Sequence, residues 1–142
     1  MKRDIETKPA LFPMPVLMVA TYDEGGTVNV MNAAWGMISD MDKITLFLDE
    51  GHKTTANIRA VRAFTVSLAD RDHIAEADFF GIASGNKMPD KFARTGLHAV
   101  KSRHVNAPII EEFPVAMECE LFEIIATEYS FAVVGRIVNT LA

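Results

Sequence analysis

The chain has 142 residues, of which 49% are hydrophobic and 23% are charged; this is typical of a globular protein and enough to bury a core in one domain spanning residues 1–142. Its formal net charge of −5 argues against nucleic acid as a partner, because no strong positive field attracts a phosphate backbone. Cys119 is the only cysteine, which excludes an internal disulfide and a cysteine-rich zinc site.

The first residues do not resemble a targeting segment. They are charged from the start and are soon interrupted by Pro9, Pro13 and Pro15, unlike a secretory signal. The longest apolar run nearby, Met14 to Ala20, is too short to span a bilayer. We therefore expect a cytoplasmic protein with no membrane partner.

The first part of the chain predicts three strands. Val16 to Tyr22 is apolar with little alternation, which favours a strand buried on both faces. The adjacent glycines within residues 23–26 favour a turn. Residues 27–31 are predicted to form the return strand, and residues 32–39 to continue it. Residues 44–48 alternate apolar and other side chains, which predicts the third strand.

Residues 51–59, Gly-His-Lys-Thr-Thr-Ala-Asn-Ile-Arg, are the most informative segment. They lie between two predicted strands, and we expect a short helix from Thr55 to Val61 with Thr54 or Thr55 as its cap. The first N–H groups of such a helix, with two hydroxyls and Lys53 beside them, form a typical phosphate site. The segment therefore points to a nucleotide-like cofactor and a redox protein.

The second half of the chain predicts short helices and a hairpin. Apolar residues recur at helical spacing over residues 72–82, and residues 89–94 indicate one more helical turn, ended by Gly96. Glu118 and Glu120 alternate with apolar residues and are expected to face solvent. Further strands are predicted over residues 64–68, 115–121 and 131–138.

Strands outnumber helices in this layout, and the helices do not alternate regularly with them. This argues against a doubly wound parallel sheet. The prediction is a mainly β, mostly antiparallel barrel with short helical insertions.

Four segments, in this order and spacing, resemble the flavin reductase-like family, the FMN-binding split β-barrels that include flavoredoxins. They are Pro-Val-Leu-Met-Val at 15–19, Asn-Val-Met-Asn-Ala-Ala-Trp at 29–35, His-Lys-Thr-Thr-Ala-Asn-Ile at 52–58, and Ser-Gly at 84–85 followed by Asp-Lys-Phe-Ala-Arg-Thr-Gly-Leu at 90–97. The resemblance covers nearly the whole chain. It implies an antiparallel split β-barrel that dimerises, with FMN in a cleft that both subunits help to form.

The resemblance also implies which residues bind the cofactor. Residues 54–57 would hold the phosphate end. Contacts with the flavin are implied for Asn29, Trp35, Thr55 and Lys91. The full predicted set is Asn29, Asn32, Ala33, Trp35, Lys53, Thr54, Thr55, Asn57 and Lys91. No catalytic acid or base is predicted, because the flavin carries the chemistry. No metal site is predicted either, because the four histidines are too scattered along the sequence.

Several of these residues also have a structural interpretation. The two threonines can serve only as helix caps, and a lone tryptophan such as Trp35 is more often part of a core than a cofactor wall. Lys91 can pair with Asp90 at the surface, and Arg94 can take its place beside a flavin. The function of Lys53 stays open.

The implied activity is that of an FMN-binding oxidoreductase of the flavin reductase type. Hydride or electrons would pass from NADH or NADPH through FMN to free flavin or a protein acceptor. The alternative is a non-enzymatic FMN electron carrier without a nicotinamide site, and a third reading is a barrel that has lost flavin. A mean hydropathy of +0.14 agrees with a homodimer that hides apolar surface.

Two departures from the family pattern favour the carrier. Ser130 stands where relatives often have a histidine near the flavin. Relatives also continue past the strand that ends near Asn139, whereas this sequence ends at Ala142. Either the sequence is shortened or the site is more open.

Overall fold

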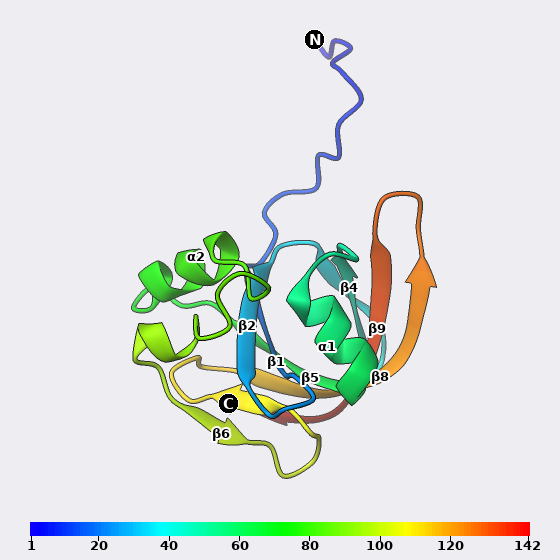
Figure 1. Cartoon of the computed structure of the whole chain (residues 1–142). Helices are drawn as coiled ribbons and strands as arrows, with labels where there is room; N and C mark the ends of the chain where they lie inside the picture. Colours follow the sequence, from blue (N-terminus) through cyan, green and yellow to red (C-terminus); the bar gives the residue numbers. More distant parts are fainter.

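The computed structural model describes residues 1–142 and consists of nine strands, two α-helices and one 3-10 turn (Figure 1). Most of the strands belong to one antiparallel sheet, and the two helices pack against it. The elements in chain order are β1 Leu17–Tyr22, β2 Val28–Ala33, β3 Gly36–Asp40, β4 Lys43–Leu48, α1 Lys53–Val61, β5 Ala63–Leu68, α2 Ile74–Ile82, η1 Ala93–Thr95, β6 Ala99–Lys101, β7 Pro108–Ile110, β8 Ala116–Ala126 and β9 Phe131–Leu141.

The main sheet has the strand order β2-β1-β5-β8-β9-β4-β3, and every pair in it is antiparallel. Its two edge strands, β2 and β3, are consecutive in the chain and are joined only by Ala34 and Trp35. So short a connection spans at most about 11 Å between Cα atoms. The sheet therefore curls until its edges face each other, but no ladder joins them. This is a split barrel, which confirms the predicted fold.

The barrel interior holds the larger of two apolar clusters. Phe64, Val66, Leu46 and Val133 are completely buried there. Phe64 lies against Gly135 of β9, where a Cβ would come within 2.4 Å of the Phe64 ring. The absence of a side chain at Gly135 thus lets the aromatic ring fill the interior.

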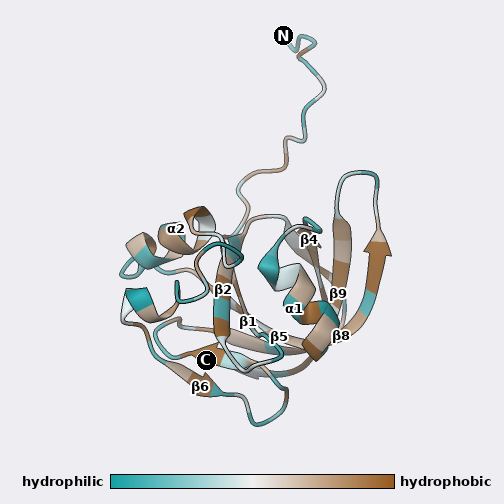
Figure 2. Cartoon of the chain, viewed as in Figure 1, coloured by the Kyte–Doolittle hydropathy of each residue, from teal (hydrophilic) through white to brown (hydrophobic).

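β1 is buried on both faces, as its unalternating sequence predicts. Leu17 and Val19 contribute to the barrel cluster, whereas Met18 and Ala20 belong to a second cluster with Phe80 of α2. α2 packs on β2, and its ribbon carries both hydrophobic and hydrophilic colours (Figure 2). α1 also contacts β1 and β2. Its hydrophilic N-terminal end and the C-terminal end of α2 line the same pocket.

The structure corrects three predictions about individual elements. β2 ends at Ala33, and residues 36–40 form a separate strand on the opposite edge. α1 begins at Lys53 after His52, and no side chain caps it, so neither threonine is the cap. Glu118 is buried rather than exposed, because the β6–β7 hairpin covers this outer face of the sheet: Val100 and Ile109 line a cavity together with Glu118.

The sequence reasoning also missed one hairpin and shortened another. β6 and β7 form a separate two-stranded sheet, and their three-residue strands are too short to show a period. β8 and β9 continue to Ala126 and Leu141 and project beyond the barrel as a long hairpin (Figure 1). The predicted turn at residues 89–96 is present as η1, with Gly96 in the left-handed conformation at φ 74°.

Candidate functional site

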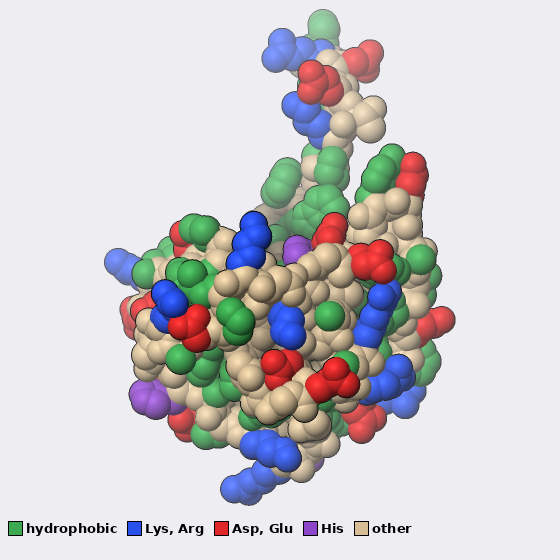
Figure 3. All heavy atoms as spheres, in the orientation of Figure 1, with side chains coloured by type: hydrophobic (Ala, Val, Ile, Leu, Met, Phe, Trp, Pro, Cys, Tyr) green, Lys and Arg blue, Asp and Glu red, His purple; other side chains and the backbone are tan.

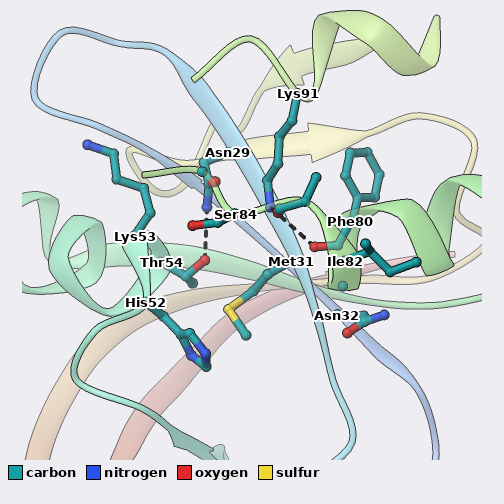
Figure 4. A pocket seen from close by; sticks show the side chains of 13 residues that line it. Asn29, Met31, Asn32, His52, Lys53, Thr54, Phe80, Ile82, Ser84 and Lys91 are labelled. Atoms are coloured by element: carbon teal, nitrogen blue, oxygen red, sulfur yellow. Dashed lines mark hydrogen bonds between the residues drawn. The ribbon is translucent and has the colours of Figure 1, made fainter. Parts of the chain in front are cut away.

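A polar pocket of about 190 Å³ lies where β2, the N-terminus of α1, the C-terminus of α2 and the loop after α2 meet (Figure 4). The helix ends bring opposite partial charges to one place, since N–H groups point out of one and carbonyls out of the other. The pocket is lined by Asn29, Met31, Asn32, His52, Lys53, Thr54, Phe80, Gly81, Ile82, Ala83, Ser84, Gly85 and Lys91.

Asn29 and Thr54 form a buried pair in this pocket. The Asn29 amide Nδ2 donates to the Thr54 hydroxyl over 2.8 Å, which leaves the hydroxyl proton of Thr54 available to another acceptor. The Asn29 Oδ1 is buried and receives no hydrogen bond from the protein. A buried amide oxygen without a partner is unfavourable, so this atom can accept from a ligand.

Gly85 allows the loop after α2 to approach Asn29 closely. A Cβ at this position would lie 2.3 Å from the Asn29 Oδ1 and 3.1 Å from the Cβ of Lys53. Any larger residue would therefore push the loop or the asparagine away. The glycine keeps the pocket narrow at the point where the unpaired oxygen lies.

The N-terminus of α1 offers several unpaired donors beside Thr54. No protein acceptor receives the backbone N–H of Lys53, Thr54 or Thr55. The first turn contains no acidic residue, and the helix dipole adds a partial positive charge there. These features suit an anion such as a phosphate.

Lys91 places a buried amine in the pocket. Its side chain is 2% exposed, and its Nζ donates to the carbonyl of Ala83 over 2.8 Å and of Phe80 over 3.2 Å, at the end of α2. No carboxylate lies within 4.0 Å of it. Burial lowers the pKa of Lys91 from 10.5 to about 8. The predicted pairing with Asp90 is absent, because Asp90 binds Arg94 instead.

Lys53 lies at the other side of the pocket and is partly exposed. Its Nζ is 3.9 Å from the Asp23 Oδ2, a weak pair at the surface. The pKa of Asp23 is lowered, mainly by a hydrogen bond from the backbone N–H of Thr27. Lys53 therefore remains available to a second anion.

Three predicted site residues lie behind the pocket wall instead of lining it. The Thr55 hydroxyl donates to the Asp49 carbonyl over 2.7 Å, and the Asn57 amide donates to the Thr21 hydroxyl over 3.0 Å. Ala33 is buried at the end of β2 in the barrel cluster. In this structure Thr55 and Asn57 hold the turn before α1 and the helix itself in place.

Trp35 lies apart from the polar pocket. It is 59% exposed, and it lines an apolar groove with Phe12, Met14, Met37 and other residues of the N-terminal segment and β3. The interpretation of Trp35 as a core residue is therefore wrong. Its small neighbours Ala34 and Gly36 permit the break between β2 and β3.

The structure adds pocket residues that the prediction did not include. His52, Ser84 and Gly85 line the pocket, although the Ser-Gly pair belongs to the segments that carry the family resemblance. Ser130 lies at the tip of the β8–β9 hairpin, where its N–H and hydroxyl bond to Thr127. It lines none of the pockets described.

None of the helices is both long and apolar enough to cross a membrane. No group of three His, Cys, Asp or Glu residues gathers in a way that could hold a metal ion.

Comparisons with known proteins agree with this geometry. The family model of the flavin reductase like domain matches residues 10–141. The flavoredoxin of Desulfovibrio vulgaris (Miyazaki F) is 35% identical with a TM-score of 0.91, over 99% of this chain and 76% of that one. An FMN-binding protein from Thermus thermophilus, solved with bound 1-cyclohex-2-enone, has the same fold at 20% identity with a TM-score of 0.85, over 99% and 80%.

Curated relatives are more distant. An uncharacterized protein of Aeropyrum pernix is 28% identical over 117 residues, which are 81% of this chain and 44% of that protein. The chain spans about half to two thirds of the length of the curated relatives it matches.

Proposed function

Because the chain belongs to the family of flavin reductase-like domains, we propose that it binds FMN in the polar pocket and acts as an oxidoreductase of the flavin reductase type. In this proposal NADH or NADPH is the electron donor, and free flavin or a protein is the acceptor. The observation that carries the proposal is Lys91, a buried cation that faces a pocket without any carboxylate partner.

The residues present fit an anionic, hydroxyl-bearing ligand. The free N–H groups of α1, the Thr54 hydroxyl and Lys53 suit the phosphate of FMN. Asn29 and Asn32 suit groups that need both donors and acceptors, such as the ribityl hydroxyls or the polar edge of the ring. Lys91 suits whichever anionic part of FMN lies nearest to it. The Thr55 and Asn57 side chains shape the site from behind.

The size of the pocket supports a shared cleft. Its volume of about 190 Å³ is below the roughly 300–1,000 Å³ of pockets that enclose a whole small-molecule ligand. We therefore propose that FMN extends beyond it and that a second copy of the chain covers the remainder. The exposed apolar groove around Trp35 supports such an interface. Light scattering that showed a monomer in the presence of FMN would contradict the shared cleft.

When bound, FMN supplies the group that accepts hydride and passes on electrons, and the protein supplies position and charge. Lys91 places a positive charge in the pocket, which favours negative charge on a bound flavin. The Asn29 oxygen orients a donor of the ligand. No side chain needs to act as an acid or a base.

The proposal is tested first by FMN and then by the nicotinamide. Flavin fluorescence titration should show binding of FMN and weaker binding of riboflavin, which lacks the phosphate. Stopped-flow mixing of the FMN-loaded protein with NADH or NADPH should bleach the flavin absorbance on a catalytic timescale.

A non-enzymatic FMN electron carrier is the second candidate function. It is favoured by the 35% identity to a protein named flavoredoxin. For a carrier, FMN would bind in the titration, but neither nicotinamide would bleach it. A protein that does not bind FMN at all would contradict both functions.

Substitutions of the two neighbouring threonines should distinguish a residue that binds FMN from one that stabilises the fold. Thr54→Val removes a hydroxyl that lines the pocket, and we expect FMN affinity to fall by about tenfold, the value of one charge-assisted hydrogen bond. Thr55→Val removes the bond to Asp49, and we expect a loss of about 1 kcal/mol in stability. Fluorescence titration and urea denaturation of both variants measure the two effects. Direct contact of Thr55 with the phosphate would instead make Thr55→Val the weaker binder.

A further inference from the structure

A second cavity, of about 320 Å³, lies beneath the β6–β7 hairpin and shares no residue with the polar pocket. Val100 and Ile109 form its apolar walls. Glu118 of β8 lines it from the main sheet. The proposed flavin function uses none of these residues.

Glu118 is unusual because it is buried with only half of its hydrogen-bonding capacity used. Its side chain is 1% exposed. One carboxylate oxygen accepts from the Asn139 amide, whereas Oε1 has no partner in the protein. A buried carboxylate without a second partner is strongly unfavourable. A hydrogen-bond donor that entered the cavity would relieve this cost.

The mouth of the cavity is basic. Lys101, Arg103 and His104 line it and are exposed. None of them forms an ion pair with Glu118 or with any other carboxylate. Basic side chains project from the lower edge of the molecule, below β6 (Figure 3).

The turn that carries these basic residues is held in place. The Ser102 hydroxyl accepts from the backbone N–H of His104 and of Val105, each over 2.9 Å. The Thr65 hydroxyl donates to the Pro108 carbonyl over 2.6 Å and ties the hairpin to the main sheet. The basic residues and the buried carboxylate thus line one cavity from two elements that are tied to each other.

We propose that this cavity binds a small zwitterion, whose ammonium group donates to Glu118 and whose phosphate or carboxylate group binds Lys101 and Arg103. Each group of such a ligand meets the charge that lacks a partner in the protein. A cavity of about 320 Å³ has room for about ten heavy atoms, since a water molecule occupies roughly 30 Å³ in the liquid.

Isothermal titration calorimetry with O-phosphoethanolamine tests the proposal. We expect O-phosphoethanolamine to bind about tenfold more tightly than inorganic phosphate, and ethanolamine to bind more weakly still, because only the first probe satisfies both ends of the cavity. Equal affinity for inorganic phosphate and O-phosphoethanolamine would overturn the proposal, as would the absence of O-phosphoethanolamine binding.

Substitutions in and outside the cavity test whether O-phosphoethanolamine binds there. Glu118→Gln should reduce the affinity for O-phosphoethanolamine to that for inorganic phosphate, and Arg103→Gln, on an exposed turn, should weaken both probes. Arg71→Gln changes an exposed arginine that does not line the cavity; it is the matched control and should change nothing. Lys91→Met should also leave the affinity unchanged; a loss there would place the probe in the polar pocket and overturn the proposal. Thermal melting shows whether Glu118→Gln folds, and if it does not, Arg103→Gln decides alone.

Discussion

Lys91→Met is expected to weaken FMN binding by about ten- to a hundredfold, the value of a charge-assisted hydrogen bond to an anion in a buried site. The methionine keeps much of the side-chain length and apolar character but removes the only buried cation in the pocket. Fluorescence titration at neutral pH measures the change.

The same variant should also remove a pH dependence. Burial lowers the pKa of Lys91 to about 8, and an anionic ligand favours the protonated amine. Below about pH 8 the amine is already charged, so binding does not depend on it. Above that pH the ligand must bind together with a proton, and the affinity of the wild-type protein should fall by up to about tenfold per pH unit. The phosphate of FMN does not titrate in this range, because its second pKa is about 6.

Stability of the FMN-free protein should follow the opposite trend. The pKa of Lys91 is lower in the folded state than the ordinary value of 10.5, so the unfolded chain binds more protons between about pH 8 and pH 10.5. The contribution of Lys91 to the free energy of unfolding therefore rises with pH over that window. Urea denaturation at several pH values, with Lys91→Met as the reference, isolates this contribution.

Lys87→Met is the matched control, because Lys87 is exposed in the same loop and does not line the pocket. It should leave both the affinity and its pH dependence unchanged. An affinity for FMN that is equal in Lys91→Met and in the wild-type protein would remove Lys91 from the binding site.

Gly135→Ala is expected to destabilise the protein by about 1–3 kcal/mol, the usual cost of an extra methyl group in a packed core. The new Cβ would lie 2.4 Å from the Phe64 ring and 3.2 Å from the Cβ of Cys119. Both neighbours are completely buried, so neither can move into free space. Urea denaturation of the FMN-free protein measures the loss.

Gly25→Ala is the control for this substitution. Gly25 lies in an exposed turn, and a Cβ there meets only the Asp23 Oδ1 at 3.4 Å, an ordinary contact. Its effect on the free energy of unfolding should be within about 0.5 kcal/mol. Adding Phe64→Leu to Gly135→Ala should cost less than the sum of the two single changes, because they share one contact. Strict additivity would show that the ring and the glycine are not coupled.

The fold was predictable because long strands reveal their burial pattern. The unalternating run in β1 matches its burial between two clusters, and the glycine pair at residues 25–26 marks the first hairpin. β6 and β7 were not predictable, since three residues cannot establish a period. Glu118 lies on the face that the alternation with Cys119 and Leu121 predicts, but its burial was not predictable, because the β6–β7 hairpin that covers it comes from a distant segment.

The residue types that line the pocket were predictable from the sequence, but the orientation of individual side chains was not. Asn29, Asn32, Lys53, Thr54 and Lys91 meet in one place. Thr54 lines the pocket and Thr55 does not, because the two side chains leave the helix in different directions. These directions were not predictable, since the helix begins at Lys53, earlier than its threonines suggest. The close approach at Gly85 depends on two distant segments, which no local pattern records.

Surface connections usually tolerate inserted residues well, but the Ala34–Trp35 connection should be an exception. It is exposed, yet it joins edge strand β2 directly to edge strand β3, between which no ladder forms. Additional residues there would lengthen this direct connection and allow the two edge strands to move apart. In a library of random insertions, this exposed site should therefore be depleted, in contrast to the turn at residues 23–26.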